Sequence, residues 1–228
     1  MPTATEEPKG ESRRWRGREP ADRIATRRRQ LLDAGLELMG TIGAAGMSMR
    51  AVCRAASLTE RYFYESFANL DALQLAVLDE VVLGARDRLL AALADAPPEP
   101  EKVFAHVVSR FTDYMDEDPR RGRIMFVESQ ATLALGGRGN ELIVEFTAPI
   151  AMSLSSGERK RNPPDDVDIR LNAHAIFGAL AFLYRPWLDG ALDISRDRFD
   201  RHATSAITEL ARARSSGAVR SGKSAKGK

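Results

Sequence analysis

The chain has 228 residues, 43% hydrophobic and 29% charged, with a net charge of +2, a composition typical of a soluble globular protein of one large domain or two small ones. It lacks both the run of about 18 uncharged apolar residues that a membrane span needs and the apolar core of a secretory signal, so we expect a cytoplasmic protein with no membrane partner. Cys53 is the only cysteine and the three histidines lie far apart, which excludes an intramolecular disulfide and predicts neither a metal site nor a cofactor.

The charge is distributed unevenly along the chain. Residues 1–68 carry 12 basic and 9 acidic side chains, residues 69–211 carry 16 and 23, and residues 212–228 carry 6 and none. An acidic middle between two basic ends is the asymmetry expected when one end of a protein meets a polyanion. The charge pattern therefore favours a nucleic acid as partner.

Both ends of the chain are predicted to lack regular structure. Residues 1–20 are rich in Pro, Gly, Glu and Arg without apolar periodicity, which indicates a flexible basic arm. Residues 215–228 are rich in Ser, Gly, Ala and Lys, which indicates a disordered basic tail. Either segment could contact DNA, the arm through the minor groove. The alternative is that both are solvated extensions.

Residues 21–68 are predicted to form a unit of three helices. In the first helix apolar residues recur at helical spacing up to a stop at Gly43. Ser48 stands at the N-cap of a second helix of little over two turns, and Thr59 at the N-cap of a third. Because helices this short are unstable alone, both must pack on the first, and a tight turn over residues 56–58 joins them.

Residues 69–214 are predicted to form one larger helical domain. Asp118 and Pro119 are typical of an N-cap and first helical residue, the pair Gly136–Gly137 is typical of a helix end, and Pro149 predicts a kink. The helices expected in this domain span residues 70–95, 99–117, 120–135, 138–155, 165–187 and 195–214. Since no convincing pair of strands is found, the predicted fold class is all-α.

The helix over residues 165–187 carries two apolar rows, one through Ile176 and one through Leu171 and Phe182. A monomer can bury only one of these rows. Small residues along the helix would let another helix approach closely. We therefore predict a homodimer assembled through this helix and the helix over residues 195–214.

A short helix, a tight turn and a second short helix, supported by an amphipathic first helix, are the parts of a helix-turn-helix, whose second helix enters the major groove of DNA. Residues 24–73 resemble the N-terminal DNA-binding domain of the TetR (tetracycline-repressor-like) family of transcriptional regulators. The residues that carry the resemblance are Leu31, Leu32, Leu38, Met39, Ser48, Val52, Cys53, Ala56, Leu58, Phe63, Tyr64, Phe67 and Leu73. The rest of the chain is similar only in its run of helices and its length.

Three residues depart from the family's pattern. Ser57 occupies a turn position where Gly is usual, Ser66 one where His is common, and Leu70 one where a Lys often meets phosphate. We expect Ser57 to strain the turn slightly. The other two departures indicate fewer contacts with the DNA backbone than a typical member makes.

Three predicted DNA contacts have distinct roles. Arg61, near the start of the recognition helix, is predicted to read a guanine through a bidentate pair of hydrogen bonds. The resemblance implies that the Tyr64 hydroxyl binds a phosphate and fixes the register. It also places Arg50 at a position that meets DNA, with a plain solvated arginine as the alternative.

Four further predicted DNA contacts each have a second interpretation. Ser48 and Thr59 lie at helix starts that suit phosphate, but capping alone would explain both. Glu60 could accept a hydrogen bond from cytosine, or it could merely favour the helix N-terminus electrostatically. Tyr62 could contact a thymine methyl group or a phosphate.

The second half of the chain is rich in aromatic and Met side chains, most of which must form the core. The resemblance implies that an apolar pocket among these helices holds a small-molecule effector. Its candidate lining residues are Phe111, Tyr114, Met115, Met125, Phe126, Phe146, Phe177 and Trp187. Glu128 and His174 could supply polar anchors, or they could be a surface glutamate and a satisfied helical histidine.

The resemblance thus implies a repressor that binds a palindromic operator as a dimer and is released by a small apolar effector. The alternative is a helical DNA-binding or interaction protein without such an effector. The chain has no nucleophile elbow, phosphate loop or metal cluster in its sequence, so we expect no enzyme activity.

Overall fold

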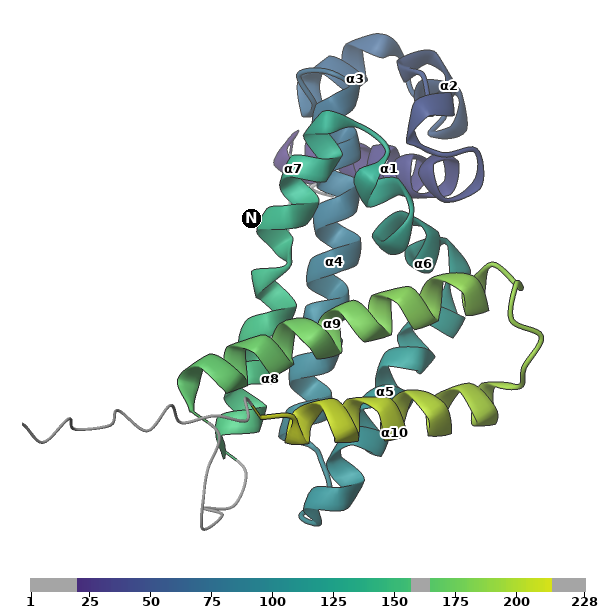
Figure 1. The fold of residues 1–228 in the computed structure, drawn as a ribbon. Coiled ribbons are helices and arrows are strands. Elements are labelled where there is room, and N and C mark those ends of the chain that lie inside the picture. The colour runs from purple at the N-terminus through teal and green to yellow at the C-terminus, as the bar shows by residue number, and fades with distance from the viewer. Residues whose placement is uncertain (1–19, 157–164, 215–228) are drawn as a thin grey trace, which may run out of the picture.

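The computed structural model of the protein describes residues 20–156 and 165–214, which form ten α-helices and two 3₁₀-helices without any strand (Figure 1). The all-α prediction is therefore confirmed for these residues. The expected basic arm and tail lie outside the described residues, apart from Pro20, which begins the first helix. Within the described ranges, no helix has the length and apolar character needed to cross a membrane.

The three-helix unit lies at one end of the molecule (Figure 1). It comprises α1 (Pro20–Thr41), the 3₁₀-helix η1 (Ala44–Gly46), α2 (Met49–Ala55) and α3 (Glu60–Ser66). Leu31, Met39, Val52 and Phe63 are almost completely buried between these helices. The short helices thus pack on α1, as their length requires.

The longest helix, α4 (Leu70–Ala94), runs from the three-helix unit into the rest of the molecule (Figure 1). The Asn69 side chain caps it by accepting a hydrogen bond from the backbone N–H of Ala72 at 2.8 Å. Leu73 and Val77 are buried near its start and Leu89 near its end. One rigid element therefore contributes to the cores of both halves.

The middle of the larger domain differs from the sequence prediction. It contains α5 (Pro100–Glu117), α6 (Pro119–Phe126), the 3₁₀-helix η2 (Glu128–Gln130), α7 (Leu133–Leu142) and α8 (Val144–Ser156). The expected helix over 120–135 is wrong, because α6 ends at Phe126 and Thr132 caps a new helix through the N–H of Leu135. The pair Gly136–Gly137 lies inside α7, which tolerates the roughly 1 kcal/mol that each glycine costs a helix.

The expected helix over 138–155 is also divided. Its first residues belong to α7, and Ile143 separates them from α8, where Pro149 lies inside the helix. The sequence carries no strong stop signal at Ile143. The break is therefore set by packing against other helices.

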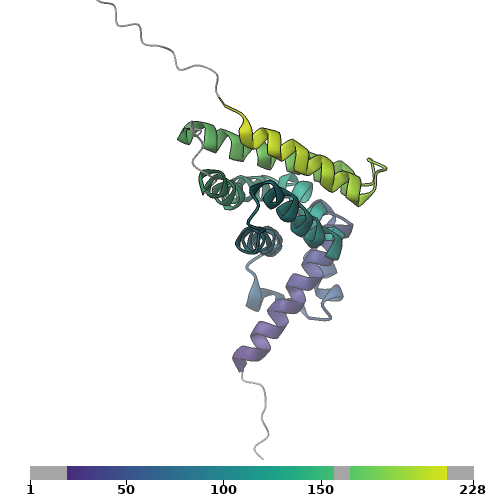
Figure 2. The same ribbon diagram turned by 90° about the horizontal axis from the view of Figure 1, so that it is seen from below.

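The last two helices, α9 (Asp166–Leu188) and α10 (Arg196–Arg212), lie side by side and antiparallel, on one side of the molecule (Figures 1 and 2). On α9, Ile176 and Tyr184 are buried, whereas Leu171 and Phe182 are 58% and 80% exposed. A single copy thus buries one side of α9 and leaves an apolar row uncovered.

Candidate nucleic-acid interface and internal cavity

The turn between α2 and α3 has the geometry of a helix-turn-helix. Ser57 takes the left-handed conformation with φ of +55°, and the N–H of Leu58 donates to the carbonyl of Cys53 at 2.9 Å. Non-glycine residues rarely adopt this conformation. The strain expected at Ser57 is therefore present in the backbone.

The inner side of α3 is fixed by aromatic packing. Phe63 is fully buried, and its ring meets those of Phe67 and Tyr64 at centroid distances of 6.0 and 5.7 Å. Because Tyr64 meets Phe63 edge-on and remains 59% exposed, its hydroxyl end is left to solvent. The core thus holds α3 in place while its outer face stays open.

The outer face of α2 and α3 carries the predicted DNA contacts. Arg50 lies 3.4 Å from Glu60, and Arg61 lies 3.3 Å from Glu65, with the two arginine side chains 80% and 85% exposed. Such exposed pairs contribute about 0–1 kcal/mol. Both guanidinium groups can therefore exchange a carboxylate for a phosphate or a base at little cost.

Six of the seven predicted DNA contacts are exposed, and Tyr62 is the exception. The Tyr62 ring is half-buried, with the Arg27 guanidinium 4.3 Å from its centroid. Arg27 also pairs with Glu65 at 3.1 Å. Arg27 was not predicted to neighbour α3, although the run Arg27–Arg28–Arg29 is a visible basic signal in the sequence.

The two predicted caps differ in their side-chain bonds. The Ser48 hydroxyl accepts a hydrogen bond from the N–H of Ala51 at 3.2 Å, so it caps α2. Thr59 precedes α3 with cap-like backbone geometry, but its hydroxyl makes no capping bond, so the capping interpretation is wrong for Thr59. Capping thus occupies the Ser48 hydroxyl and leaves that of Thr59 exposed.

A buried carboxylate joins the three-helix unit to the larger domain. Glu128 accepts hydrogen bonds from the N–H of Ala44 at 2.8 Å and from Nε of Arg123 at 3.1 Å, and Arg123 also donates to the carbonyl of Thr41 at 3.0 Å. We call these four residues the inter-domain seam. Neither alternative considered for Glu128, a surface residue or a ligand anchor, matches this position.

Close backbone approach tightens the same region. Gly43 has φ of +82°, and a Cβ atom there would lie 3.0 Å from Oε1 of Glu128. A Cβ at Gly40 would overlap the side chain of Arg120, which also pairs with Glu37 and, at 2.8 Å, with Asp118. The glycines therefore let α1 and α6 meet without a gap.

An apolar cavity of about 70 Å³ lies inside the larger domain, and we call it the inner cavity. Five of the eight candidate pocket residues line it, namely Phe111, Met125, Phe126, Phe146 and Phe177. Tyr184 and the aliphatic residues Leu89 and Ile150 also line it and were not predicted from the sequence. No periodic signal separates such residues from the rest of the core.

The other three candidates lie outside this lining. Met115 is fully buried in the core, and the Tyr114 hydroxyl donates to the carbonyl of Val81 at 2.9 Å. The Trp187 ring stacks on Phe199 at a centroid distance of 4.4 Å. All three side chains are thus engaged in packing beside the cavity. His174 is exposed on α9 and contacts the carbonyl of Arg170.

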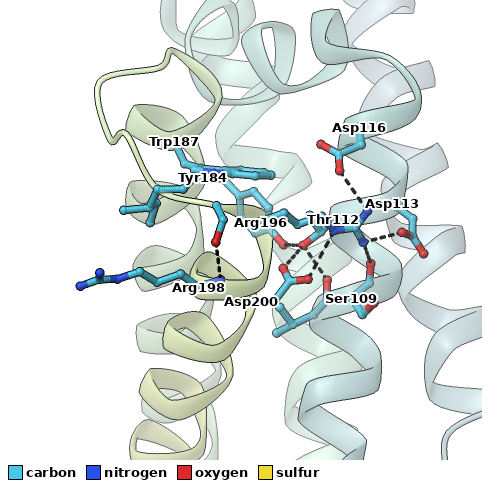
Figure 3. Close-up of polar contacts among 12 residues, drawn as sticks. Ser109, Thr112, Asp113, Asp116, Tyr184, Trp187, Arg196, Arg198 and Asp200 are labelled. Atoms are coloured by element: carbon cyan, nitrogen blue, oxygen red, sulfur yellow. Dashed lines mark hydrogen bonds and ion pairs between the residues drawn. The ribbon is translucent and has the colours of Figure 1, made fainter.

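A polar network joins Tyr184, which lines the inner cavity, to side chains of α5 and α10 (Figure 3). Thr112 Oγ1 lies 2.7 Å from the Tyr184 hydroxyl and donates to Asp200 at 2.8 Å. Arg196 bonds Asp200 at 3.5 Å and Asp116 at 3.0 Å. Burial raises the pKa of the Tyr184 phenol well above its usual value, so the ring stays neutral. The network holds this ring in one position.

Comparison with known proteins identifies the N-terminal part of the chain. Residues 31–77 match the family model described as bacterial regulatory proteins, tetR family. Among curated proteins no match was found. The matched residues span the C-terminal half of α1, all of α2 and α3 and the beginning of α4.

Solved structures resemble the whole described fold. A transcriptional regulator FadR from Bacillus subtilis in complex with stearoyl-CoA is 17% identical, with a TM-score of 0.67, 80% of this chain covered and 97% of that one. A putative TetR-family regulator from Syntrophomonas wolfei is 14% identical, with a TM-score of 0.69, and the match covers 83% of this chain and 96% of that one. A tetR-family regulator from Streptomyces coelicolor is 18% identical, with a TM-score of 0.64, and the match covers 82% of this chain and 80% of that one. Identities this low establish the fold alone.

Proposed function

We propose that this chain, whose residues 31–77 match the tetR family model, is a DNA-binding transcriptional regulator of that family. It is a repressor that binds a palindromic operator as a homodimer. A small apolar molecule in the inner cavity releases it from DNA. The observation that carries the proposal is the combination of an exposed, loosely paired α3 face with an apolar cavity in one chain.

The DNA contacts follow from the exposed face. Arg61 reads a base edge, and Arg50 and Tyr64 bind phosphates. Thr59 supports this assignment, because its hydroxyl is exposed and makes no cap. Ser48 and Glu60 lie beside these residues on the same face, and Tyr62 contributes through the edge that Arg27 leaves open.

A homodimer forms through the uncovered row of α9, with α10 beside it. Leu171 and Phe182 are large apolar side chains exposed to solvent in one copy, and exposed apolar surface of this kind suits an interaction site. A two-fold axis along this row makes the interface self-complementary. It also requires an operator with half-sites whose centres lie about 34–36 Å apart.

Release by a ligand requires a physical link between the cavity and the recognition helix. Phe126 lines the inner cavity and ends α6, two residues before Glu128 in the inter-domain seam. A ligand that moves the end of α6 therefore changes the hydrogen bonds to Ala44 and Thr41, and with them the position of the three-helix unit. It must prefer the released state by its own binding energy.

The decisive experiment is a gel shift of the full-length protein on the DNA that flanks its own gene, with and without a series of small apolar compounds. We expect one dimer to bind one palindrome and to leave it when ligand is added. Matched DNA with scrambled half-sites is the control. Equal binding to both DNAs, or specific binding that no ligand weakens, favours the alternative of a helical DNA-binding protein without an effector.

A further inference from the structure

Glu65, in the last turn of α3, bonds two arginines at once. Its Oε1 accepts a hydrogen bond from Nε of Arg61 at 3.3 Å, and its Oε2 accepts one from Nη2 of Arg27 at 3.1 Å. Arg61 belongs to the exposed face of α3, whereas Arg27 belongs to α1. One carboxylate therefore joins the outer face of the recognition helix to the helix on which it packs.

Arg27 is held by more than this ion pair. Its guanidinium lies 4.3 Å from the centroid of the Tyr62 ring, within the range of a cation–π contact. The side chains of Arg27 and Glu65 are 23% and 34% exposed, whereas that of Arg61 is 85% exposed. Because water and salt screen partly buried pairs less, the pair with Arg27 is the firmer of the two. Glu65 is thus an acceptor held in place from α1.

The bond to Glu65 occupies only one of the three nitrogens of Arg61. Among the described residues, Nη1 and Nη2 of Arg61 have no partner. A bidentate contact with O6 and N7 of guanine needs two N–H donors, and these two nitrogens can supply them while Nε keeps its bond. Arg61 can therefore read a base without leaving Glu65, although the pair is weak enough to be exchanged.

The other arginine pair on this face lacks such a support. Arg50 donates through Nε to Glu60 at 3.4 Å, and the two side chains are 80% and 51% exposed. Among the described residues, Glu60 pairs with no second cation. Reading a base needs a side chain that neighbouring contacts hold in one orientation, whereas a phosphate contact tolerates several. The contrast therefore distinguishes Arg61 as the oriented arginine.

Resting on the proposed function, in which Arg61 reads a base, we infer that Glu65 is a positioning residue for sequence recognition. It orients the guanidinium of Arg61 through Nε, and Arg27 holds Glu65 in place. Part of the conformational entropy of the Arg61 side chain is thus lost before DNA binds. Because a carboxylate on this face also repels phosphates, Glu65 raises discrimination between sequences while it lowers the general affinity for DNA.

The test measures discrimination, the ratio of the affinities of the full-length protein for its operator and for single-base variants of that operator. Glu65→Ala should lower this ratio about threefold to tenfold at the position that Arg61→Ala affects, the size of one hydrogen bond. Binding to DNA with scrambled half-sites should not weaken, because a negative charge is removed. Since both affinities belong to one protein, a change in its folded fraction cancels from the ratio. Equal weakening on every DNA, with the ratio unchanged, would overturn the inference.

A double-mutant cycle shows whether Glu65 acts through Arg61. In the Arg61→Ala background, Glu65→Ala should not change discrimination further, and an additional loss at the same position contradicts the inference. Glu65→Gln should keep part of the discrimination, because its amide oxygen can still accept from Nε.

Two further variants test the support from α1. Arg27→Gln should reproduce part of the loss of discrimination. If it instead weakens binding to all sequences alike and lowers the salt slope, Arg27 is a phosphate contact and its role in holding Glu65 is wrong. Asp33→Ala is the matched control, because Asp33 is an exposed acid of α1 that pairs with Arg29. It should leave discrimination unchanged, and a loss equal to that of Glu65→Ala contradicts the assignment.

The outcomes separate this inference from the proposed function. If Arg61→Ala lowers discrimination and Glu65→Ala does not, the base contact of the proposed function stands and the positioning role fails. If Arg61→Ala itself leaves discrimination unchanged, the base contact fails and the inference fails with it.

Discussion

On the outer face of α3, Arg61 reaches one carboxylate at 3.3 Å from a side chain that is 85% exposed. Between α5 and α10, Arg196 instead bonds Asp113, Asp116 and Asp200 and the carbonyl of Ser109 (Figure 3). The first pair is worth about 0–1 kcal/mol and is easily exchanged. The second set fixes a cavity wall. Recognition of DNA needs charges that can change partners, whereas recognition of a small molecule needs a cavity that keeps its shape.

The inter-domain seam lies between these two regions and combines their properties. Its central carboxylate, Glu128, is 5% exposed, but its partner Arg123 reaches the surface with a side chain that is 41% exposed. The buried carboxylate of Glu128 is therefore held rigidly, whereas the exposed guanidinium of Arg123 can change its position. A change in either region can be transmitted there without breaking the fold.

The largest effect is expected from Glu128→Ala, which removes the buried acceptor from the seam. The N–H of Ala44 is left unsatisfied, so the free energy of unfolding should fall by about 2–3 kcal/mol, measured by urea denaturation. Glu128→Gln keeps an acceptor oxygen and should lose less. The control is Glu209→Ala, which breaks an exposed pair with Arg212 and should cost below about 0.5 kcal/mol. If Glu128→Ala and Glu209→Ala lowered the free energy of unfolding equally, the hydrogen bonds of the inter-domain seam would contribute no more than an exposed ion pair.

The next effect tests the adaptable charges of α3. Arg61→Ala should cost about 1–3 kcal/mol of binding to the preferred operator and relax selectivity at one position per half-site. Tyr64→Phe should weaken all sequences alike and barely change the salt slope, because the lost hydroxyl is neutral. Arg50→Ala should lower the slope by about one ion per contact. The measurement is binding to single-base operator variants at several salt concentrations. If Arg61→Ala weakened every variant equally with a smaller salt slope, Arg61 would be a phosphate contact.

A smaller effect concerns pH at the junction of α1 and α6. Burial pushes the pKa of Asp118 upward, but hydrogen bonds from Arg120 outweigh it, so the pKa lies below its usual value. The stabilisation is therefore present above about pH 4, the pKa of an unfolded aspartate, and is lost as the pH falls through the lower folded-state pKa. Asp118→Asn keeps an N-cap but cannot titrate. The fall in its free energy of unfolding at acidic pH should therefore be smaller than that of the unaltered protein by about 1 kcal/mol. Parallel curves of unfolding free energy against pH for the two proteins would contradict this.

The smallest effect should have the opposite sign. Ser57→Gly relieves the left-handed conformation of the turn and should raise stability by about 0.5–1 kcal/mol, measured as the thermal midpoint. Ser205→Gly, in the exposed middle of α10, should instead lower it by about 0.5 kcal/mol. A loss in both variants would mean that the turn is not strained.

Local signals in the sequence predicted much of the fold. Ser48 and Asp118 each cap a helix at the predicted position with a side-chain hydrogen bond, because a cap acts within three residues. The helix-turn-helix was also predictable, since its turn and apolar spacing occupy adjacent residues. The helix over 120–135 was not, because the break after Phe126 places Glu128 against Ala44, which is 84 residues distant.

The sequence by itself determined the helical fold class, the position of the three-helix unit and the exposed face of α3, since each follows from periodicity and capping over short distances. Only the tertiary structure decided which aromatic residues surround the inner cavity. Phe126 and Trp187 look alike as sequence, yet one lines the cavity and the other stacks on Phe199. Likewise, the burial of Glu128 depends on contacts between distant helices. Such contacts leave no periodic pattern along the chain, because they are set by how whole helices pack.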